Sequence, residues 1–223
     1  MSGSVFALAD ARVAYGGVEV LRGVTLTIDA GERVALIGKS GAGKSSLLRL
    51  LHAQRRERTA LVPQDLGLVR TLSVFHNIYM GRLAHHSALY NIANLVRPLP
   101  REVAAVRTLT EALDLSEKLF APAGSLSGGQ QQRVAVGRAL HFGGDALLAD
   151  EPVSALDPQR TRDVLRMVID RHPTVVIAMH DIPLLLELAT RVIGIADGRV
   201  VLDAPTAGLP AGEIAPFVAT GEE

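Results

Sequence analysis

Hydrophobic and polar positions divide the chain into short apolar runs and longer segments with helical spacing. Apolar runs with the length of buried strands stand at 34–37, 60–62, 146–149 and 174–179. Helical spacing and helix start signals predict helices over about 44–56, 131–140, 158–171 and 182–190. Apolar strands that alternate with helices are typical of a sheet covered on both faces. We therefore expect an α/β fold with a mainly parallel sheet.

The two ends and the middle of the chain depart from this alternation. The first 37 residues predict antiparallel strands with turns at Gly16-Gly17 and at 29–31. A hairpin around Asp197-Gly198 joins 192–196 to 199–203. Residues 71–120 are mostly helical in pattern and predict a helical subdomain inserted into the core. The expected organisation is one domain over 1–223: a core at about 1–70 and 121–203, a helical subdomain at about 71–120 plus the helix that follows 126–130, and a C-terminal tail at 204–223.

Composition limits which binding partners and which cellular location are expected for the chain. The 223 residues include 23 basic and 23 acidic side chains, so no net field favours nucleic acid and no nucleic-acid partner is expected. The sequence has no cysteine, which excludes disulfide scaffolds, thiolate zinc sites and cysteine nucleophiles. No stretch approaches the ~20 apolar residues of a membrane helix. Residues 1–10 lack the features of a signal peptide, so a cytoplasmic protein is expected.

A glycine-rich segment at 38–45 matches the phosphate-loop pattern in full. It lies between an apolar run and a predicted helix, where backbone N–H groups and the helix dipole favour phosphate oxygens. Lys44 is placed to reach the β- and γ-phosphates, and the Ser45 hydroxyl to hold Mg²⁺. The alternative is a chance glycine-rich turn before a helix. The nucleotide-binding residues expected here are Gly38, Lys39, Ser40, Gly41, Ala42, Gly43, Lys44, Ser45 and Ser46.

Polar side chains end three other predicted strands. Asp150 and Glu151 follow the run 146–149, where Asp150 is expected to orient Mg²⁺ and Glu151 to polarise an attacking water. His180 ends the run 174–179 and is expected to contact the γ-phosphate. Gln64 follows another strand, where its amide is placed for Mg²⁺ or the attacking water. The alternatives are a solvated acidic turn and a structural histidine.

A second anion-binding helix start is predicted without a lysine of its own. Small residues and a hydroxyl precede the helix at 131–140, which favours phosphate at its N-terminus. Two such sites with one acidic pair indicate two chains that complete each other's sites head to tail. The alternative is a capped helix after a flexible hinge. The residues of this segment are Leu126, Ser127, Gly128, Gly129 and Gln130.

Taken together, these residues resemble the ATP-binding cassette of ABC transporters. The similarity runs from about residue 4 to 203 and implies a P-loop NTPase core that hydrolyses ATP with Mg²⁺. Matching motifs occur in the family's order at 38–45, 126–130, 150–151, 154–157 and His180.

The resemblance also implies roles for single residues. Tyr15 is similar to the aromatic residue that stacks on adenine, and Asp157 is expected to communicate across a dimer interface. Ser127 and Gly129 of one chain are expected to contact the γ-phosphate held by the other. The chain departs from the family where Gln64 follows Lys44 by 20 positions, because typical cassettes carry a longer stretch with an additional strand pair.

A finer similarity suggests the transport role. The amino-acid sequences of residues 77–83, 127–133 and 148–152 are similar to the corresponding segments of phosphonate importers. The expected function is an ATPase subunit that couples dimer closure to import of phosphonates or related phosphorus oxyanions. The implied partners are a second copy, membrane permease subunits and a periplasmic or extracellular solute-binding protein, with the chain peripheral on the inner face of the membrane. The alternatives are a cassette ATPase that regulates a membrane complex without cargo, and an importer of another solute.

One apolar group within the helical stretch has two interpretations. Leu72, Phe75, Ile78 and Tyr79 are spaced to accept a permease helix, or to form the core of the subdomain.

Overall fold

A computed structural model describes residues 3–179 and 181–218 of the chain. Strands dominate the N-terminal part, helices the middle, and the two alternate afterwards. The elements in chain order are β1 (Ser4–Tyr15), β2 (Val18–Asp29), β3 (Arg33–Ile37), α1 (Lys44–Gln54), β4 (Thr59–Val62), α2 (Val74–Tyr79), η1 (Met80–His85), α3 (Ala88–Val96), α4 (Pro100–Ala112), η2 (Ser116–Lys118), η3 (Ala123–Ser125), α5 (Gly128–Phe142), β5 (Ala146–Asp150), α6 (Pro158–Arg171), β6 (Thr174–Ala178), α7 (Ile182–Leu188), β7 (Arg191–Ala196), β8 (Arg199–Pro205) and α8 (Ala211–Val218).

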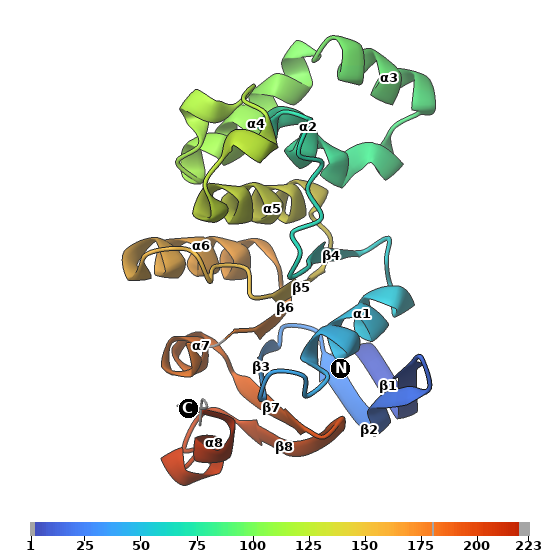
Figure 1. Cartoon of the computed structure of the whole chain (residues 1–223), viewed down its shortest axis with the longest axis vertical. Coiled ribbons are helices and arrows are strands. Elements are labelled where there is room, and N and C mark those ends of the chain that lie inside the picture. The colour runs from blue at the N-terminus through green and yellow to red at the C-terminus, as the bar shows by residue number, and fades with distance from the viewer. Residues whose placement is uncertain (1–2, 180, 219–223) are drawn as a thin grey trace.

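A six-stranded sheet in the order β4-β5-β6-β3-β7-β8 runs through the middle of the molecule (Figure 1). The first five strands in that order are parallel, and β8 at the edge pairs antiparallel with β7. β1 and β2 form a separate antiparallel sheet. The predicted fold class is therefore confirmed: an α/β core, an N-terminal antiparallel part and an inserted group of helices.

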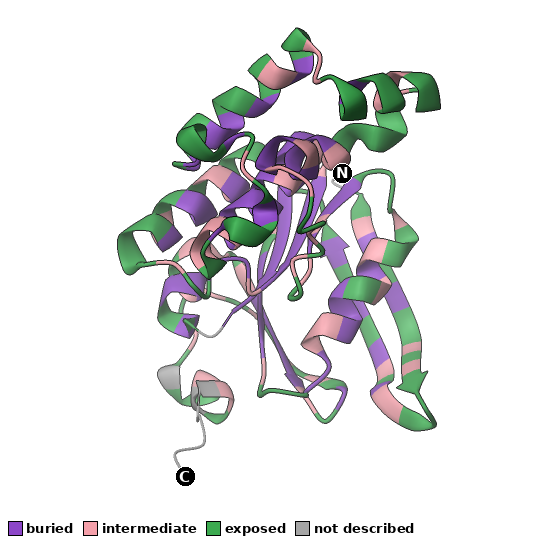
Figure 2. Cartoon of the chain, turned by 45° about the horizontal axis from the view of Figure 1, so that its top comes forward, coloured by how far each residue is buried: buried purple, intermediate pink, exposed green. Residues whose placement is uncertain are grey.

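Successive residues of the central strands face two different cores. In β5, Leu147 and Ala149 face a core shared with α5 and α6, whereas Ala146 and Leu148 face a core shared with α1, β1 and β2. Side chains alternate along a strand, so a strand covered on both faces is apolar at every position. This burial along the whole strand (Figure 2) explains why the central strands are unbroken apolar runs in the sequence.

The inserted helices lie over α5, on one side of the sheet (Figure 1). Phe75 and Ile78 are fully buried and Tyr79 nearly so, whereas Leu72 is half-buried, so three of the four residues belong to the subdomain core. These three buried residues offer no surface to a permease helix. The most exposed apolar side chains of this region lie on α3, where Leu89 and Val96 each expose 81% of their surface.

Three features differ from the sequence expectation or extend it. β1 and β2 are long strands of 12 residues each, not short ones. The predicted tail from 204 contains the end of β8 and the helix α8. α1 leads into β4 through a tight turn, whose Arg55 and Arg58 each pair with Asp145, just before β5, at 3.1 Å and 2.7 Å. Among the described residues, no helix has the length and apolar character needed to cross a membrane.

Candidate active site

The carboxyl ends of four central strands lie level at one edge of the sheet. The register pairs Leu36 of β3 with Ala178 of β6, and Ala178 with Asp150 of β5. The loop 38–45 follows β3, and Gln64 follows β4 by two positions. Ligands of parallel sheets gather at this edge because loops from several strands converge there.

The glycine-rich loop leaves the first backbone N–H groups of α1 available. The N-cap residue is Gly43, with φ of +111°, and no described side chain caps the helix. A Cβ atom on Gly43 would lie 2.8 Å from Leu21 Cδ2 and 3.1 Å from the carbonyl oxygen of Val20, so only glycine fits there without displacement. Uncapped N–H groups at the positive end of a helix dipole form an anion site.

Lys44 lies across this loop. Its Nζ donates hydrogen bonds to the carbonyl oxygens of Gly38 at 2.7 Å and Lys39 at 3.1 Å. Burial lowers the pKa of Lys44 from its usual value, and the negative charges of Asp150 and Glu151 oppose the shift. A half-buried ammonium group is stabilised by any further anion, so a bound phosphate would favour its charged form.

The predicted chemistry converges on one hollow of about 150 Å³. Its lining comes from β2, the glycine-rich loop, α1, and the segments that follow β4 and β5. The lining residues are Val20, Ser40, Gly41, Gly43, Lys44, Ser45, Ser46, Gln64, Asp150 and Glu151. Val20 was missed, because nothing in the sequence of β2 indicates that it reaches this loop. The hollow thus brings together a cation, two carboxylates, an amide and hydroxyl groups.

The donor set suits a hard divalent cation. Ser45, Gln64 and Asp150 supply hydroxyl, amide and carboxylate oxygens, which are the ligand types that Mg²⁺ binds together with substrate phosphates and water. Asp150 is nearly fully buried at 5% exposure, so its charge needs a partner at this place. The residues present therefore fit Mg²⁺.

Glu151 is the first residue after β5 and adopts the left-handed conformation, with φ of +52°. Its N–H donates to the carbonyl of Ala178 at 2.8 Å, and its own carbonyl accepts from Gln132 Nε2 at 3.3 Å. A non-glycine residue in this region costs of the order of 1–3 kcal/mol and persists where its surroundings enforce it. Gln132 was not predicted as a site residue.

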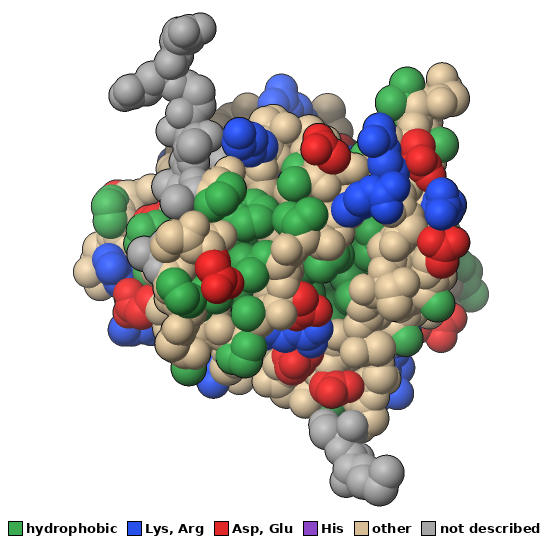
Figure 3. Space-filling view, turned by 90° about the horizontal axis from the view of Figure 1, so that it is seen from below, with side chains coloured by type: hydrophobic (Ala, Val, Ile, Leu, Met, Phe, Trp, Pro, Cys, Tyr) green, Lys and Arg blue, Asp and Glu red, His purple; other side chains and the backbone are tan. Residues whose placement is uncertain are grey.

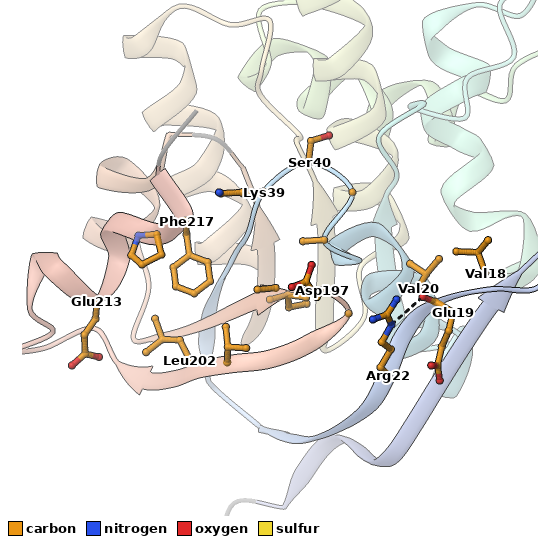
Figure 4. A pocket seen from close by; sticks show the side chains of 17 residues that line it. Val18, Glu19, Val20, Arg22, Lys39, Ser40, Asp197, Leu202, Glu213 and Phe217 are labelled. Carbon is orange, nitrogen blue, oxygen red and sulfur yellow. Dashed lines mark hydrogen bonds between the residues drawn. The ribbon is translucent and has the colours of Figure 1, made fainter. Parts of the chain in front are cut away.

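A larger hollow of about 840 Å³ adjoins the first and shares Val20, Ser40 and Gly41 with it. Hydrophobic side chains gather in the middle of the face seen in Figure 3. In Figure 4, Phe217 and Leu202 line one side of the hollow and Val18 and Val20 the other.

The remaining phosphate-loop residues lie around these two hollows. Lys39 and Ala42 line the larger hollow, which adjoins the smaller one. Gly38 lines neither, and a Cβ atom there would lie 2.5 Å from the carbonyl oxygen of Ile195. Tyr15 also lines neither and is 51% exposed at the end of β1.

The segment 126–130 starts α5 away from these hollows. Ser127 caps the helix by accepting from the N–H of Gln130, and the Gln130 side chain accepts from the N–H of Ser127, which completes a capping box. Leu126 is buried. This local geometry is that of a capped helix, one of the two alternatives.

The helix start faces a hollow of its own, of about 380 Å³. Gly128 and Gly129 line it together with Asp157, which caps α6 by accepting from the N–H of Arg160 at 3.1 Å. The starts of α1 and α5 thus line different hollows of one chain. His180, expected at the γ-phosphate, lies outside the described residues.

Comparisons with known proteins agree with this geometry. A family model described as ABC transporter matches residues 21–59 and 51–154. The phosphonates import ATP-binding protein PhnC of Pseudomonas fluorescens is 38% identical over 221 residues, covering 86% of this chain and 82% of that protein. The protein of the same name from Shouchella clausii is 37% identical, over 85% of this chain and 81% of that one.

Solved structures show the same fold. A dimeric ATP-binding cassette in a post-hydrolysis state with ADP and Pi has a TM-score of 0.74 and 25% identity, over 91% of this chain and 99% of that one. A nucleotide-free cassette from an ABC transporter has a TM-score of 0.75 and 20% identity, over 97% and 95%. The chain therefore belongs to the ABC transporter family, as an ATP-binding domain whose ATP hydrolysis is coupled to transport.

Proposed function

We propose that this chain is the ATPase subunit of an importer for phosphonates or related phosphorus oxyanions. Two similar proteins, from Pseudomonas fluorescens and Shouchella clausii, bear the name of phosphonate import ATP-binding proteins. The observation that carries the ATPase role is the hollow that gathers Lys44 at the start of α1 with Asp150 and Glu151 at the end of β5.

In this proposal the residues of the hollow and its surroundings share the tasks of binding and hydrolysing ATP. The N–H groups at the start of α1 and the ammonium of Lys44 bind the β- and γ-phosphates of ATP. The carboxylate of Glu151 accepts a proton from the attacking water, and the amide of Gln64 orients that water. Tyr15, exposed at the end of β1, stacks on adenine, and His180 contacts the γ-phosphate.

The site is proposed to use Mg²⁺. Ser45, Asp150 and Gln64 would hold the ion, which when bound neutralises charge on the β- and γ-phosphates. The buried carboxylate of Asp150 supports this assignment, because a cation would offset the cost of its burial.

A second copy is proposed to complete each site. The solved cassette with ADP and Pi is a dimer, and 126–130 and the phosphate loop of this chain line separate hollows. Head-to-tail pairing would bring Ser127 and Gly129 of one copy to the γ-phosphate bound by the other. Asp157, which lines the same hollow, would lie at that interface and communicate between the sites.

The wider assembly follows from the import role. We assign 1–223 to one ATPase domain, with its helical subdomain at about 71–120 and α5 toward permease subunits on the inner face of the membrane. A periplasmic or extracellular solute-binding protein would deliver the cargo through the permease.

Growth on a phosphonate as the sole phosphorus source tests the import role. Loss of the gene is expected to abolish growth, the wild-type chain to restore it, and Glu151→Gln not to restore it. Growth on inorganic phosphate is the control. Undiminished phosphonate uptake in the deletion strain would contradict the cargo assignment, and would favour another solute or a regulatory role without cargo.

A further inference from the structure

The side chain of Gln132 is buried between α5 and the loop that follows β5. It is 7% exposed, and its amide makes three hydrogen bonds to that loop. Nε2 donates to Ser154 Oγ at 2.6 Å and to the carbonyl oxygen of Glu151 at 3.3 Å, while Oε1 accepts from the N–H of Ala155 at 2.8 Å. One amide therefore spans the loop from the proposed water-activating residue to the turn before α6.

One of these bonds restrains the backbone carbonyl of Glu151, while a separate bond restrains its N–H. Its N–H is fixed by the carbonyl of Ala178 at the end of β6, and its carbonyl by Gln132. A left-handed non-glycine residue relaxes when such restraints are removed, because its φ is unfavourable. The position of the Glu151 side chain depends on this backbone, so a restraint on its carbonyl bears on where the carboxylate points.

The same helix packs tightly on the loop one turn earlier. A Cβ atom on Gly129 would lie 2.6 Å from the carbonyl oxygen of Ala155, so the first turn of α5 touches the backbone that Gln132 bonds. Because the two backbones are in close contact here, a shift of this turn toward the loop would displace the loop at 151–155.

We propose that Gln132 is a positioning residue that couples the first turn of α5 to the Glu151 carboxylate. This inference rests on the proposed function, in which Glu151 activates water and residues 127–129 contact the nucleotide of the partner. Contact of α5 with that nucleotide then orients the Glu151 of its own chain, which serves the other site. Gln132 thereby links the two ATP sites through one buried amide.

Substitution by an isosteric apolar side chain tests the amide itself. Gln132→Met keeps the volume and removes all three hydrogen bonds, so kcat is expected to fall about tenfold or more. The KM for ATP and the nucleotide affinity of the isolated chain are expected to stay at the wild-type values, because the phosphate loop is untouched. Gln159→Met, the same change on an exposed glutamine of α6, is the matched control and is expected to keep the wild-type kcat.

A pH-dependent rescue separates positioning from general damage. In Gln132→Glu the ionised carboxylate accepts from Ala155 but does not donate to Glu151, whereas the protonated form donates. Burial raises the pKa of such a carboxyl group. Its kcat and its melting temperature, each relative to wild type at the same pH, are expected to rise as the pH is lowered from about 8 to about 5. The comparison with wild type at each pH removes effects of the charged groups that both proteins share in the loop, α5 and α6, namely Glu151, Asp157, Arg133 and Arg160.

A double-variant comparison completes the test. Because Gln132 acts through Glu151, adding Gln132→Met to Glu151→Gln is expected to leave the residual single-turnover rate unchanged. An equal fold-loss in both backgrounds, or wild-type kcat in Gln132→Met, would overturn the inference. The proposed function would survive that result if Glu151→Gln alone still abolished turnover. If Gln132→Met melts far below wild type, the pH response of Gln132→Glu becomes the deciding test. A kcat of Gln132→Glu relative to wild type that does not change with pH then overturns the inference.

Discussion

Lys44 Nζ lies 2.7 Å from the carbonyl oxygen of Gly38, so the two ends of the glycine-rich loop are joined by one ammonium group. This contact holds the positive charge over the loop, next to the uncapped start of α1. Burial lowers the pKa of Lys44, and the acidic pair at 150–151 opposes that shift. The loop is therefore arranged before nucleotide arrives, which reduces the ordering that binding requires.

Lys44→Ala is expected to weaken ATP binding about 100-fold or more, because charge-assisted bonds to phosphate are removed from a partly buried site. The measurement is titration of the isolated chain with a fluorescent ATP analogue. Lys118→Ala, which changes an exposed lysine in η2, is the matched control and is expected to bind normally. Equal affinity of Lys44→Ala and wild type would rule out the assigned role.

Glu151→Gln is expected to keep ATP affinity and to lower kcat by about 100-fold or more, because general-base catalysis is lost while the shape is kept. ATP should then accumulate a closed dimer, seen as a larger species in size-exclusion chromatography. Glu57→Gln, in the exposed turn after α1, is the control and should show neither effect. Normal turnover in Glu151→Gln would assign water activation to another group.

Ser127→Asp is expected to keep the fold and to block dimer closure. Aspartate is as good an N-cap as serine, so the start of α5 is preserved, but its charge repels the γ-phosphate of the partner. ATP binding by the isolated chain should be unchanged, and ATP should no longer produce the dimer in the Glu151→Gln background. Ser127→Asn, a neutral cap of equal size, should retain dimerisation. Full dimerisation of Ser127→Asp would speak against contact in trans.

His141 predicts a dependence of stability on pH. Burial lowers the pKa of His141 to about 4, and the positive charge of Arg82 adds to the shift. Between about pH 6.5 and pH 4 the unfolded chain binds a proton that the folded chain does not, so stability falls as the pH falls, by roughly 3 kcal/mol in total. His141→Gln should reduce this slope in urea melts, whereas exposed His85→Gln should keep it. Equal slopes for all three proteins would refute this origin.

Much of the fold was predictable because its central strands are buried on both faces. The runs at 34–37, 146–149 and 174–179 correspond closely to β3, β5 and β6. Because these strands are buried on both faces, nearly all of their residues are apolar, and the apolar runs mark where the strands lie. The convergence of Gln64 and Glu151 on one hollow followed from the same reasoning, because parallel strands end at one edge.

What escaped prediction depends on packing between distant segments. The bond from Gln132 to the loop at 151–155 depends on how α5 sits against β5, which no local pattern records. Val20 reaches the phosphate loop only through the docking of the β1–β2 sheet. The helix α8 was missed because it is 8 residues long and contains Pro216, which weakens a helix signal.

Complementation between two inactive variants tests most directly whether each ATP site is shared by two copies. A Glu151→Gln chain and a Ser127→Asp chain are mixed before ATP is added. In the mixed dimer one site combines both changes, whereas the other combines the intact Glu151 of one copy with the intact Ser127 of its partner. The account predicts that the mixture regains a substantial ATPase rate, up to about a quarter of wild type, the value reached when pairing is random so that half of the dimers are mixed and each has one intact site. A rate no higher than the sum of the two separate variants would contradict it.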